Sequence, residues 1–254
     1  MTLTLRPHQT KAVKAMLRNT KGQIIIPTGG GKTMCMIDDA MNEFSRTVSS
    51  QTIVVVAPRI LLANQLSAEF LYHNLDGAAE PNATVNVMHV HSGETHHFST
   101  TKVDDIRQFN YDTACDQKHL LIFTTYHSLH KIVESNIVVD TIYFDEAHNG
   151  VQKNFVEAVE HFSTHSARAY FFTATPKHSL TPSKAGMNRT EVYGNVICNV
   201  PAPKLVEEGH ILPPKVAVYK TRILEKDELV VDADCDQMIN ALDNIQKDLS
   251  LIHI

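Results

Sequence analysis

The stretch Ile24-Ile-Ile-Pro-Thr-Gly-Gly-Gly-Lys-Thr33 decides the fold expected for this chain. An apolar, β-branched run typical of a buried strand leads into three glycines and then into a helix-compatible segment from Lys32. Glycines let backbone amides converge on an anion, and the first turn of a helix adds its dipole. The stretch therefore predicts a phosphate-binding loop between a strand and a helix, with an ordinary glycine turn as the alternative.

Two side chains of this loop have expected roles. Lys32 is expected to reach the β- and γ-phosphates of a nucleotide, and the Thr33 hydroxyl to ligate Mg²⁺. The strict pattern has a glycine five residues before Gly31, where this chain has Ile26, so the match is partial. The other residues expected around the phosphates are Pro27, Thr28, Gly29, Gly30 and Gly31.

Apolar runs of the same kind recur along the chain, separated by helix-compatible or polar segments. Runs such as Ile53-Val-Val-Val56 are typical of strands buried on both faces of a parallel sheet. The sequence therefore predicts an α/β fold with a mainly parallel sheet flanked by helices on both faces. The expected strands are 23–26, 52–57, 84–90, 120–124, 141–144 and 169–173, and the expected helices are 7–17, 32–44, 60–71 and 155–162.

Two adjacent carboxylates follow the expected strand 141–144, within Ile142-Tyr-Phe-Asp-Glu-Ala-His148. Ligands of an open parallel sheet bind at the carboxyl ends of its strands, where the phosphate loop is also expected. Asp145 is expected to hold Mg²⁺ through its water shell, and Glu146 to orient and deprotonate an attacking water. The alternative is a pair of acids that simply favours a helix N-terminus.

The composition is that of a globular protein. Hydrophobic residues make up 43% and charged residues 20% of 254 residues, which excludes disordered and collagen-like classes. A net charge of −5 argues against binding a duplex by bulk charge but allows a local basic site. No apolar run reaches the roughly 20 residues of a membrane span, and the N-terminus does not resemble a secretory signal. A cytoplasmic protein without a membrane partner is expected.

The pattern changes from about Val192, where prolines cluster and a polar tail follows. We expect a first domain over residues 1–220, and a linker or the start of a truncated second domain over 221–254. A helix is expected near 235–249. The cysteines show no metal-binding spacing and are expected to be free thiols; they are Cys35, Cys115, Cys198 and Cys235.

Six segments, in order, resemble the motifs of superfamily-two helicases and translocases. They are Leu5–Gln9, Pro27–Thr33, Ala57–Arg59, Thr124–Leu129, Asp145–His148 and Thr173–Pro176. The resemblance covers about residues 3–220 and implies the first of two RecA-like domains, which binds ATP and Mg²⁺. It implies that Lys32, Asp145, Glu146 and His148 are catalytic, and that Arg6 and Gln9 lie at the adenine.

The resemblance also implies a track for nucleic acid. The residues expected there are Pro58, Arg59, Gly93, Thr124 and Thr125, and those expected to couple the track to the ATP site are Thr173 and Thr175. Each has a simpler alternative: a solvated arginine at a helix start, β-branched residues at a strand end, or a helix cap. For Arg6 the alternative is packing beside the nucleotide.

Asp145-Glu-Ala-His148, Thr173-Ala-Thr-Pro176 and the stretch Leu205-Val-Glu-Glu-Gly-His-Ile-Leu-Pro213 resemble type I and type III restriction motors and phage or bacterial repair helicases. DNA is therefore favoured over RNA, and a bacterial or phage-infected cell is favoured, with association with the nucleoid as one location. The motifs of a second RecA-like domain, including its arginine finger, are missing after Val230. The chain thus resembles half a motor that has little or no activity alone. Oligomeric state stays open.

Two rival functions remain. One is a phosphate-loop protein that is not a motor, such as a kinase-like or regulatory nucleotide-binding domain. The other is a fragment that binds ATP or nucleic acid without turnover.

A histidine cluster also suggests a metal site; its members are His89, His91, His96 and His97. No cysteine or paired carboxylate lies beside it in the sequence, so a solvated loop is expected instead.

Overall fold

The computed structural model describes residues 4–47, 49–75, 85–181 and 184–213. The chain divides into two compact units, residues 1–212 and 213–254, and only Pro213 of the second unit lies within the described ranges. None of the helices in the described ranges has the length and apolar composition needed to span a bilayer. The expected domain end near residue 220 and the expected helix near 235–249 both lie outside the described residues.

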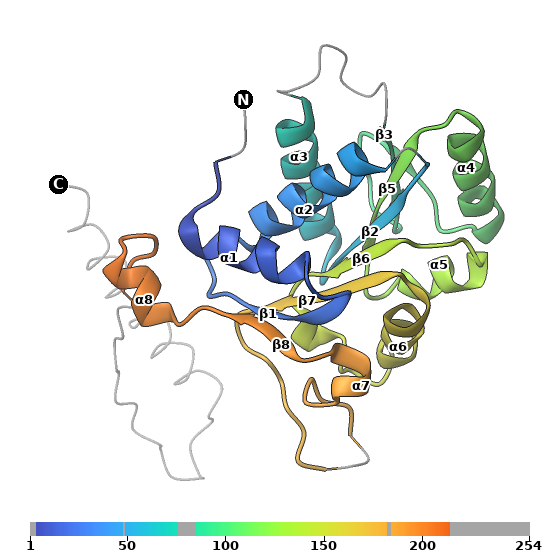
Figure 1. Ribbon diagram of the computed structural model, residues 1–254. Helices are drawn as coiled ribbons and strands as arrows, with labels where there is room; N and C mark the ends of the chain where they lie inside the picture. Colours follow the sequence, from blue (N-terminus) through green and yellow to red (C-terminus); the bar gives the residue numbers. More distant parts are fainter. Residues whose placement is uncertain (1–3, 48, 76–84, 182–183, 214–254) are drawn as a thin grey trace, which may run out of the picture. The chain divides into compact units, whose positions relative to one another are not determined.

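The first unit is built on one sheet of eight strands in the order β4-β3-β5-β2-β6-β7-β1-β8 (Figure 1). Every pair of neighbouring strands is parallel. Their bounds are β1 Lys21–Ile25, β2 Thr52–Ala57, β3 Val85–Val90, β4 Phe98–Ser99, β5 His119–Thr125, β6 Thr141–Phe144, β7 Arg168–Thr173 and β8 Val196–Asn199. The predicted α/β class with a parallel sheet is confirmed.

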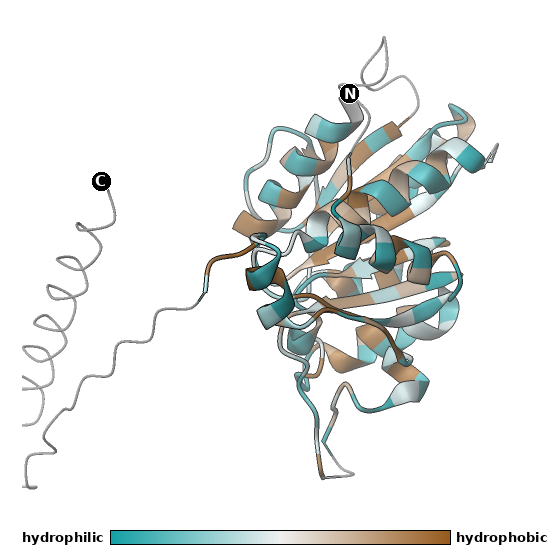
Figure 2. Cartoon of the chain, turned by 60° about the vertical axis from the view of Figure 1, so that its left-hand side comes forward, coloured by the Kyte–Doolittle hydropathy of each residue, from teal (hydrophilic) through white to brown (hydrophobic). Residues whose placement is uncertain are grey.

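Helices cover both faces of the sheet, and each face has its own apolar core. One core joins the strands to α1 (Pro7–Met16), α2 (Lys32–Arg46), α3 (Ile60–Leu75) and α8 (Ala202–Glu207). The other joins them to α4 (Val103–Cys115), α5 (Leu129–Ser135), α6 (Val156–His165) and α7 (Thr190–Tyr193). The strands are mostly hydrophobic in Figure 2, whereas the helices mix both classes along their surfaces. Burial on both sides explains why the central strands are apolar almost throughout.

The six predicted strands and four predicted helices all occur, with ends shifted by a few residues. The elements without a prediction are weak in sequence. Strand β4 has two residues, and α4 buries only Ile106 and Thr113 of its length, so its apolar periodicity is faint. Helices α7 and α8 are a single turn or little more; α7 packs against α6 and β1, and α8 contributes buried Leu205 to the core.

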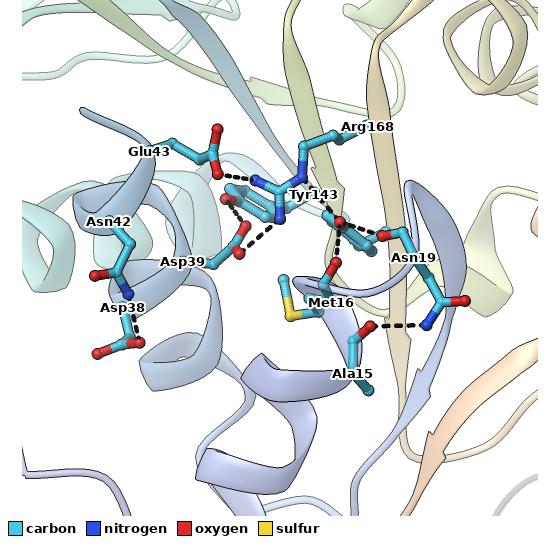
Figure 3. Close-up of polar contacts among 10 residues, drawn as sticks. Ala15, Met16, Asn19, Asp38, Asp39, Asn42, Glu43, Tyr143 and Arg168 are labelled. Carbon is cyan, nitrogen blue, oxygen red and sulfur yellow. Dashed lines mark hydrogen bonds and ion pairs between the residues drawn. The ribbon is translucent and has the colours of Figure 1, made fainter. Parts of the chain in front are cut away.

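A buried polar cluster, here named the Arg168 network, ties α2 to β6 and β7 (Figure 3). Arg168 Nη2 donates to Asp39 Oδ1 at 2.7 Å, and Nη1 lies 2.8 Å from Glu43 Oε1. Tyr143 Oη donates to Asp39 Oδ2 at 2.6 Å. Arg168 Nε donates to Tyr170 Oη at 2.9 Å, and the single proton of that hydroxyl is shared between the Met16 carbonyl at 2.8 Å and the Asn19 carbonyl, just after α1, at 2.6 Å. The network therefore holds three elements that also carry the candidate site.

Candidate functional site

The predicted nucleotide residues follow three neighbouring strands, β1, β7 and β6, at the same edge of the sheet. The phosphate loop follows Ile25 at the end of β1, and Asp145 follows Phe144 at the end of β6. Thr173 is the last residue of β7, which lies between them. Parallel pairing thus brings together segments that are more than 100 residues apart in the sequence.

The phosphate loop has the backbone that its glycines permit. Gly29 and Gly31 both have φ of +78°, a left-handed conformation that residues with a side chain rarely adopt. Helix α2 begins directly at Lys32. At Gly30 the constraint is space, because a Cβ would lie 2.5 Å from Ile26 Cγ2 and 2.9 Å from the Pro27 carbonyl oxygen. Ile26, the departure from the strict pattern, is therefore the fully buried floor of this turn.

The remaining loop residues face outward to different degrees. Thr28 and Gly29 are exposed, whereas Pro27 and Thr33 are partly buried. The Thr33 hydroxyl at the first turn of α2 and the carboxylate of Asp145 are both hard oxygen donors, which is the donor type that Mg²⁺ prefers. The residue types at this edge therefore fit a magnesium–nucleotide complex.

A line of polar contacts joins the phosphate loop to the acidic strand end and on to β7. Lys32 Nζ lies 2.9 Å from Glu146 Oε1, and Glu146 Oε2 lies 3.5 Å from His148 Nδ1. His148 Nδ1 is 2.9 Å from Thr173 Oγ1, which also accepts the Thr175 backbone N–H at 3.1 Å. Thr173 is fully buried and Thr175 is exposed. The structure thus brings three of the four predicted catalytic residues, Lys32, Glu146 and His148, into one set of contacts with both predicted coupling residues.

Glu146 is held in an unusual backbone conformation, with φ of +45° and ψ of +54°. Such angles cost of order 1–3 kcal/mol for a residue with a side chain, and they often occur at functional sites. Two residues without a predicted role hold this segment. Asn149 Nδ2 donates to the Glu146 carbonyl at 2.9 Å, and Tyr126 Oη donates to the Asp145 carbonyl at 3.0 Å. No local pattern marks Tyr126 for this contact, because its partner lies on another strand.

Asp145 carries an electrostatic cost in this structure. Burial of its carboxyl group, together with the neighbouring charge of Glu146, raises the pKa of Asp145 from 3.8 to about 6, although Lys32 opposes the shift. A bound cation would stabilise the ionised form of this buried carboxyl group, so the raised pKa is consistent with a role as a metal ligand.

The predicted adenine residues lie beside the phosphate loop, at the start of α1. Gln9 is 4% exposed; its Oε1 accepts the Arg6 backbone N–H at 2.8 Å, and its Nε2 donates to the Gly31 carbonyl at 3.3 Å. Arg6 is exposed, and its Nη1 donates to the His210 carbonyl at 3.3 Å. His8, which had no predicted role, is buried with Nε2 at 2.8 Å from the Gly30 carbonyl. The adenine roles of Arg6 and Gln9 stay predictions.

The predicted nucleic-acid residues lie at the carboxyl ends of β2, β5 and β3, on the other half of the same edge; Thr124 and Thr125 are the last two residues of β5. Arg59 is exposed, and Pro58 and Gly93 are partly buried. Thr124 is fully buried, however, and its hydroxyl donates to the Val90 carbonyl at 2.9 Å. Thr125 is 3% exposed, and its hydroxyl contacts Ser128 Oγ at 3.4 Å. A nucleic-acid contact through either hydroxyl therefore does not fit this placement, because both lie inside the protein.

The expectation of a solvated histidine loop is wrong for two of its four members. His89 and His91 are 0% and 2% exposed, with His89 Nδ1 at 3.0 Å from His91 Nε2 and His89 Nε2 at 3.1 Å from Ser67 Oγ. Burial, with the neighbouring histidines, lowers the pKa of His89 to about 4, so the ring is neutral. His96 and His97 are exposed. They line an open hollow of about 730 Å³ between α3 and the loop after β3.

Residues 2–178 match the family of the type III restriction enzyme res subunit. The match covers well over half of the chain and includes the phosphate loop, the acidic strand end and β7. The chain belongs to the type III restriction enzyme res-subunit family. No curated protein is significantly similar to this family member in sequence.

Solved structures agree with the family assignment in fold. The res-family chain is similar to a nuclease-deletion mutant of the type ISP restriction-modification enzyme LlaGI, with a TM-score of 0.67 and 23% identity over 82% of this chain and 21% of that one. For the ATP-dependent type ISP enzyme LlaBIII, the TM-score is 0.66 and the identity 21%, over 81% of this chain and 15% of that one. For the helicase domain of Hef from Pyrococcus furiosus, the TM-score is 0.50 and the identity 20%, over 75% of this chain and 37% of that one. The fold is thus the RecA-like α/β fold shared with these structures, and the chain spans about a fifth or less of the two restriction enzymes' lengths.

Proposed function

We propose that this chain is the ATP-binding half of an ATP-dependent helicase or translocase that acts on nucleic acid. The observation that carries the proposal is the ion pair between Lys32 and Glu146, at 2.9 Å. It places the cation of the phosphate loop directly against the acid that follows β6. A turn that merely connected β1 to α2 would need neither residue.

Each residue of this site has a role in the proposed reaction. Lys32 exchanges Glu146 for the β- and γ-phosphates of ATP, and the amides of the loop surround the same anion. Glu146, once released from Lys32, orients a water and accepts its proton. Thr33 and Asp145 hold Mg²⁺, which neutralises charge on the phosphates when bound. Burial of Asp145 supports that role, because a cation lowers the cost of its charge.

The contact of His148 with Thr173 supports a coupling role. Thr173 Oγ1 also accepts the backbone N–H of exposed Thr175, so a shift of the acidic strand end is transmitted to the segment after β7. Tyr126 gives a second route, since it follows β5 and contacts the Asp145 carbonyl. The first route ends at exposed Thr175, and the second reaches the end of β5 on the nucleic-acid half of the edge.

DNA is the proposed nucleic acid. LlaGI and LlaBIII were solved with a DNA substrate mimic and with DNA, respectively, and both share this fold. In this chain Arg59 is an exposed cation on the nucleic-acid half, and Pro58 and Gly93 are partly buried near it in the predicted track. Turnover is proposed to require a second RecA-like domain that completes the cleft. The second candidate function is binding of ATP without turnover. We propose that the second domain distinguishes the two functions, since hydrolysis requires it and binding does not.

The test is nucleotide binding measured by calorimetry with Mg·ADP and Mg·ATP. Lys32→Ala removes the cation at the phosphates, and we expect binding to fall below detection. Lys14→Ala, an exposed lysine on α1, is the matched control and keeps wild-type affinity. Equal affinity of wild type and Lys32→Ala would refute the assignment of the phosphate loop.

A further inference from the structure

A group of three side chains lies outside the proposed catalytic residues, where the turn after α8 meets α1. His8, Glu208 and His210 each offer one ligand atom, and these atoms all lie within 4.8 Å of one another. Glu208 Oε2 is 3.6 Å from His210 Nε2, and the rings of His8 and His210 have centroids 5.2 Å apart. We propose that these residues bind one divalent transition-metal ion of the zinc type.

The state of His8 points to a ligand. Its side chain is 4% exposed, and Nε2 lies 2.8 Å from the Gly30 carbonyl, so Nε2 carries the proton and donates it. Nδ1 is then a lone-pair acceptor, and within the described residues it is buried without a hydrogen-bond partner. A histidine that donates one ring nitrogen to a backbone carbonyl and presents the other nitrogen is the usual arrangement of a metal ligand.

The turn that supplies the other two ligands is fixed by its backbone. Helix α8 ends at Glu207, and Gly209 has φ of +71°. The Gly209 N–H donates to the Val206 carbonyl at 3.0 Å and the His210 N–H to the Leu205 carbonyl at 2.8 Å, which is the hydrogen-bond pair of a Schellman motif. The sequence Glu208-Gly-His210 therefore has one defined conformation, with both side chains on the side of His8.

The same turn is docked against the phosphate loop. Arg6 Nη1 donates to the His210 carbonyl, and Ile211 Cγ2 lies 3.5 Å from the position that a Cβ on Gly29 would take. Buried Leu205 approaches the corresponding position at Gly30 to 3.1 Å. The three ligands thus come from two segments about 200 residues apart that are already in place before an ion binds.

Two nitrogens and one carboxylate oxygen form a donor set suited to zinc. Zinc bonds to such atoms are about 2.0–2.2 Å long, so two ligand atoms of one tetrahedral ion lie about 3.3–3.6 Å apart. Rotation of the exposed Glu208 side chain and the partly buried His210 ring closes the remaining distance. Water fills the fourth position. The ion would hold the end of α8 to α1 and, through His8, steady the Gly30 carbonyl of the phosphate loop.

The experiment measures binding of Zn²⁺ alone to untagged protein by calorimetry, with no nucleotide present, and the visible absorption of a Co²⁺ substitute. Wild type is expected to bind one ion at this site and to gain thermal stability from it. Glu208→Gln and His210→Gln each remove one ligand and are expected to weaken that binding at least about tenfold. His8→Gln is expected to do the same and keeps an amide donor near Gly30.

The matched control is His165→Gln on α6, where His161 and His165 stack at 4.4 Å and offer a surface pair that also attracts metal ions. This variant should keep the tight site. The proposal is overturned if Glu208→Gln and His210→Gln bind Zn²⁺ as wild type does, or if only His165→Gln loses binding. Folding of each variant is checked by its melting without metal. The result is independent of the proposed ATPase function, because Lys32 is untouched and nucleotide is absent.

Discussion

The Arg168 network and the candidate site are built on the same three elements, α2, β6 and β7, but at different positions along them. Helix α2 contributes Lys32 to the site and Asp39 to the network, and β6 leads from Tyr143 in the network to Asp145 in the site. In the network, Asp39 is 0% and Arg168 14% exposed, and they are joined by short, direct contacts. In the site, Glu146 is 26% exposed, its backbone is strained, and the pKa of Asp145 is raised.

The difference separates stability from function within a single set of elements. A buried charge with several partners fixes the relative positions of helix and strands, and losing one partner is costly. A site must instead exchange its partners for substrate, so its ion pair is left open to solvent on one side. We therefore expect changes in the network to affect unfolding and changes in the site to affect binding or turnover.

The largest expected effect is on turnover in the site. Glu146→Gln keeps the shape of the side chain but removes the base, so hydrolysis in a protein with both RecA-like domains should fall about 10²–10⁴-fold. Nucleotide affinity and unfolding should change little. Glu157→Gln, an exposed acid in the first turn of α6, is the control. Steady-state hydrolysis close to wild type in Glu146→Gln would show that another group is the base.

The next effect is on stability in the network. Arg168→Met leaves the Asp39 carboxylate buried without its cation, and we expect the free energy of unfolding to fall by about 3–5 kcal/mol in a urea titration. Lys131→Met removes a partly exposed lysine paired with Glu134 at 3.0 Å and should cost less than about 1 kcal/mol. Equal losses in the two variants would contradict the distinction drawn between the network and an exposed pair.

Asp145 should show that the site reduces stability when no cation is bound. The pKa of Asp145 is raised in the folded protein to about 6, against 3.8 for an ordinary aspartate. The folded state then binds more protons between these values, so the free energy of unfolding falls as pH rises from about 4 to 6. The loss amounts to about 3 kcal/mol above pH 6.

Asp145→Asn should remove this loss. We expect the variant to be more stable than wild type at pH 8 without Mg²⁺, and the difference to shrink toward pH 4. Urea titrations at the two pH values measure it. A constant difference between wild type and variant across this range would show that the carboxyl of Asp145 is not the titrating group.

The smallest effect is expected on thermal stability, when the hydroxyl of the coupling residue Thr173 is removed. Thr173→Val removes the hydroxyl that contacts His148 and accepts the Thr175 N–H, which should cost about 1 kcal/mol and lower the Tm by about 2–4 °C. Thr164→Val, on the surface of α6, is the control and should melt as wild type does. Nucleotide binding should persist in Thr173→Val. A loss of binding as large as that of Lys32→Ala would place Thr173 in the phosphate site itself.

By itself the sequence determined the class of fold, the six main strands, and the glycine turn and acidic strand end at which a nucleotide site is predicted. These features depend on residues that are adjacent in the sequence. Strands covered on both faces are apolar, and consecutive glycines allow the short turn that leads into Lys32. The family assignment and the fold comparison agree with that interpretation.

Only the tertiary structure decided which of these residues touch. Sequence placed Thr124 and Thr125 at a nucleic-acid surface, but parallel pairing of β5 with β3 and β2 buries both side chains. It left His89 and His91 in solvent, although the fold encloses them beside Ser67. Contacts such as Tyr126 with Asp145, or His8 with Gly30, join residues far apart in the chain. The order of strands in the sheet sets those distances, and no local pattern of residues encodes that order.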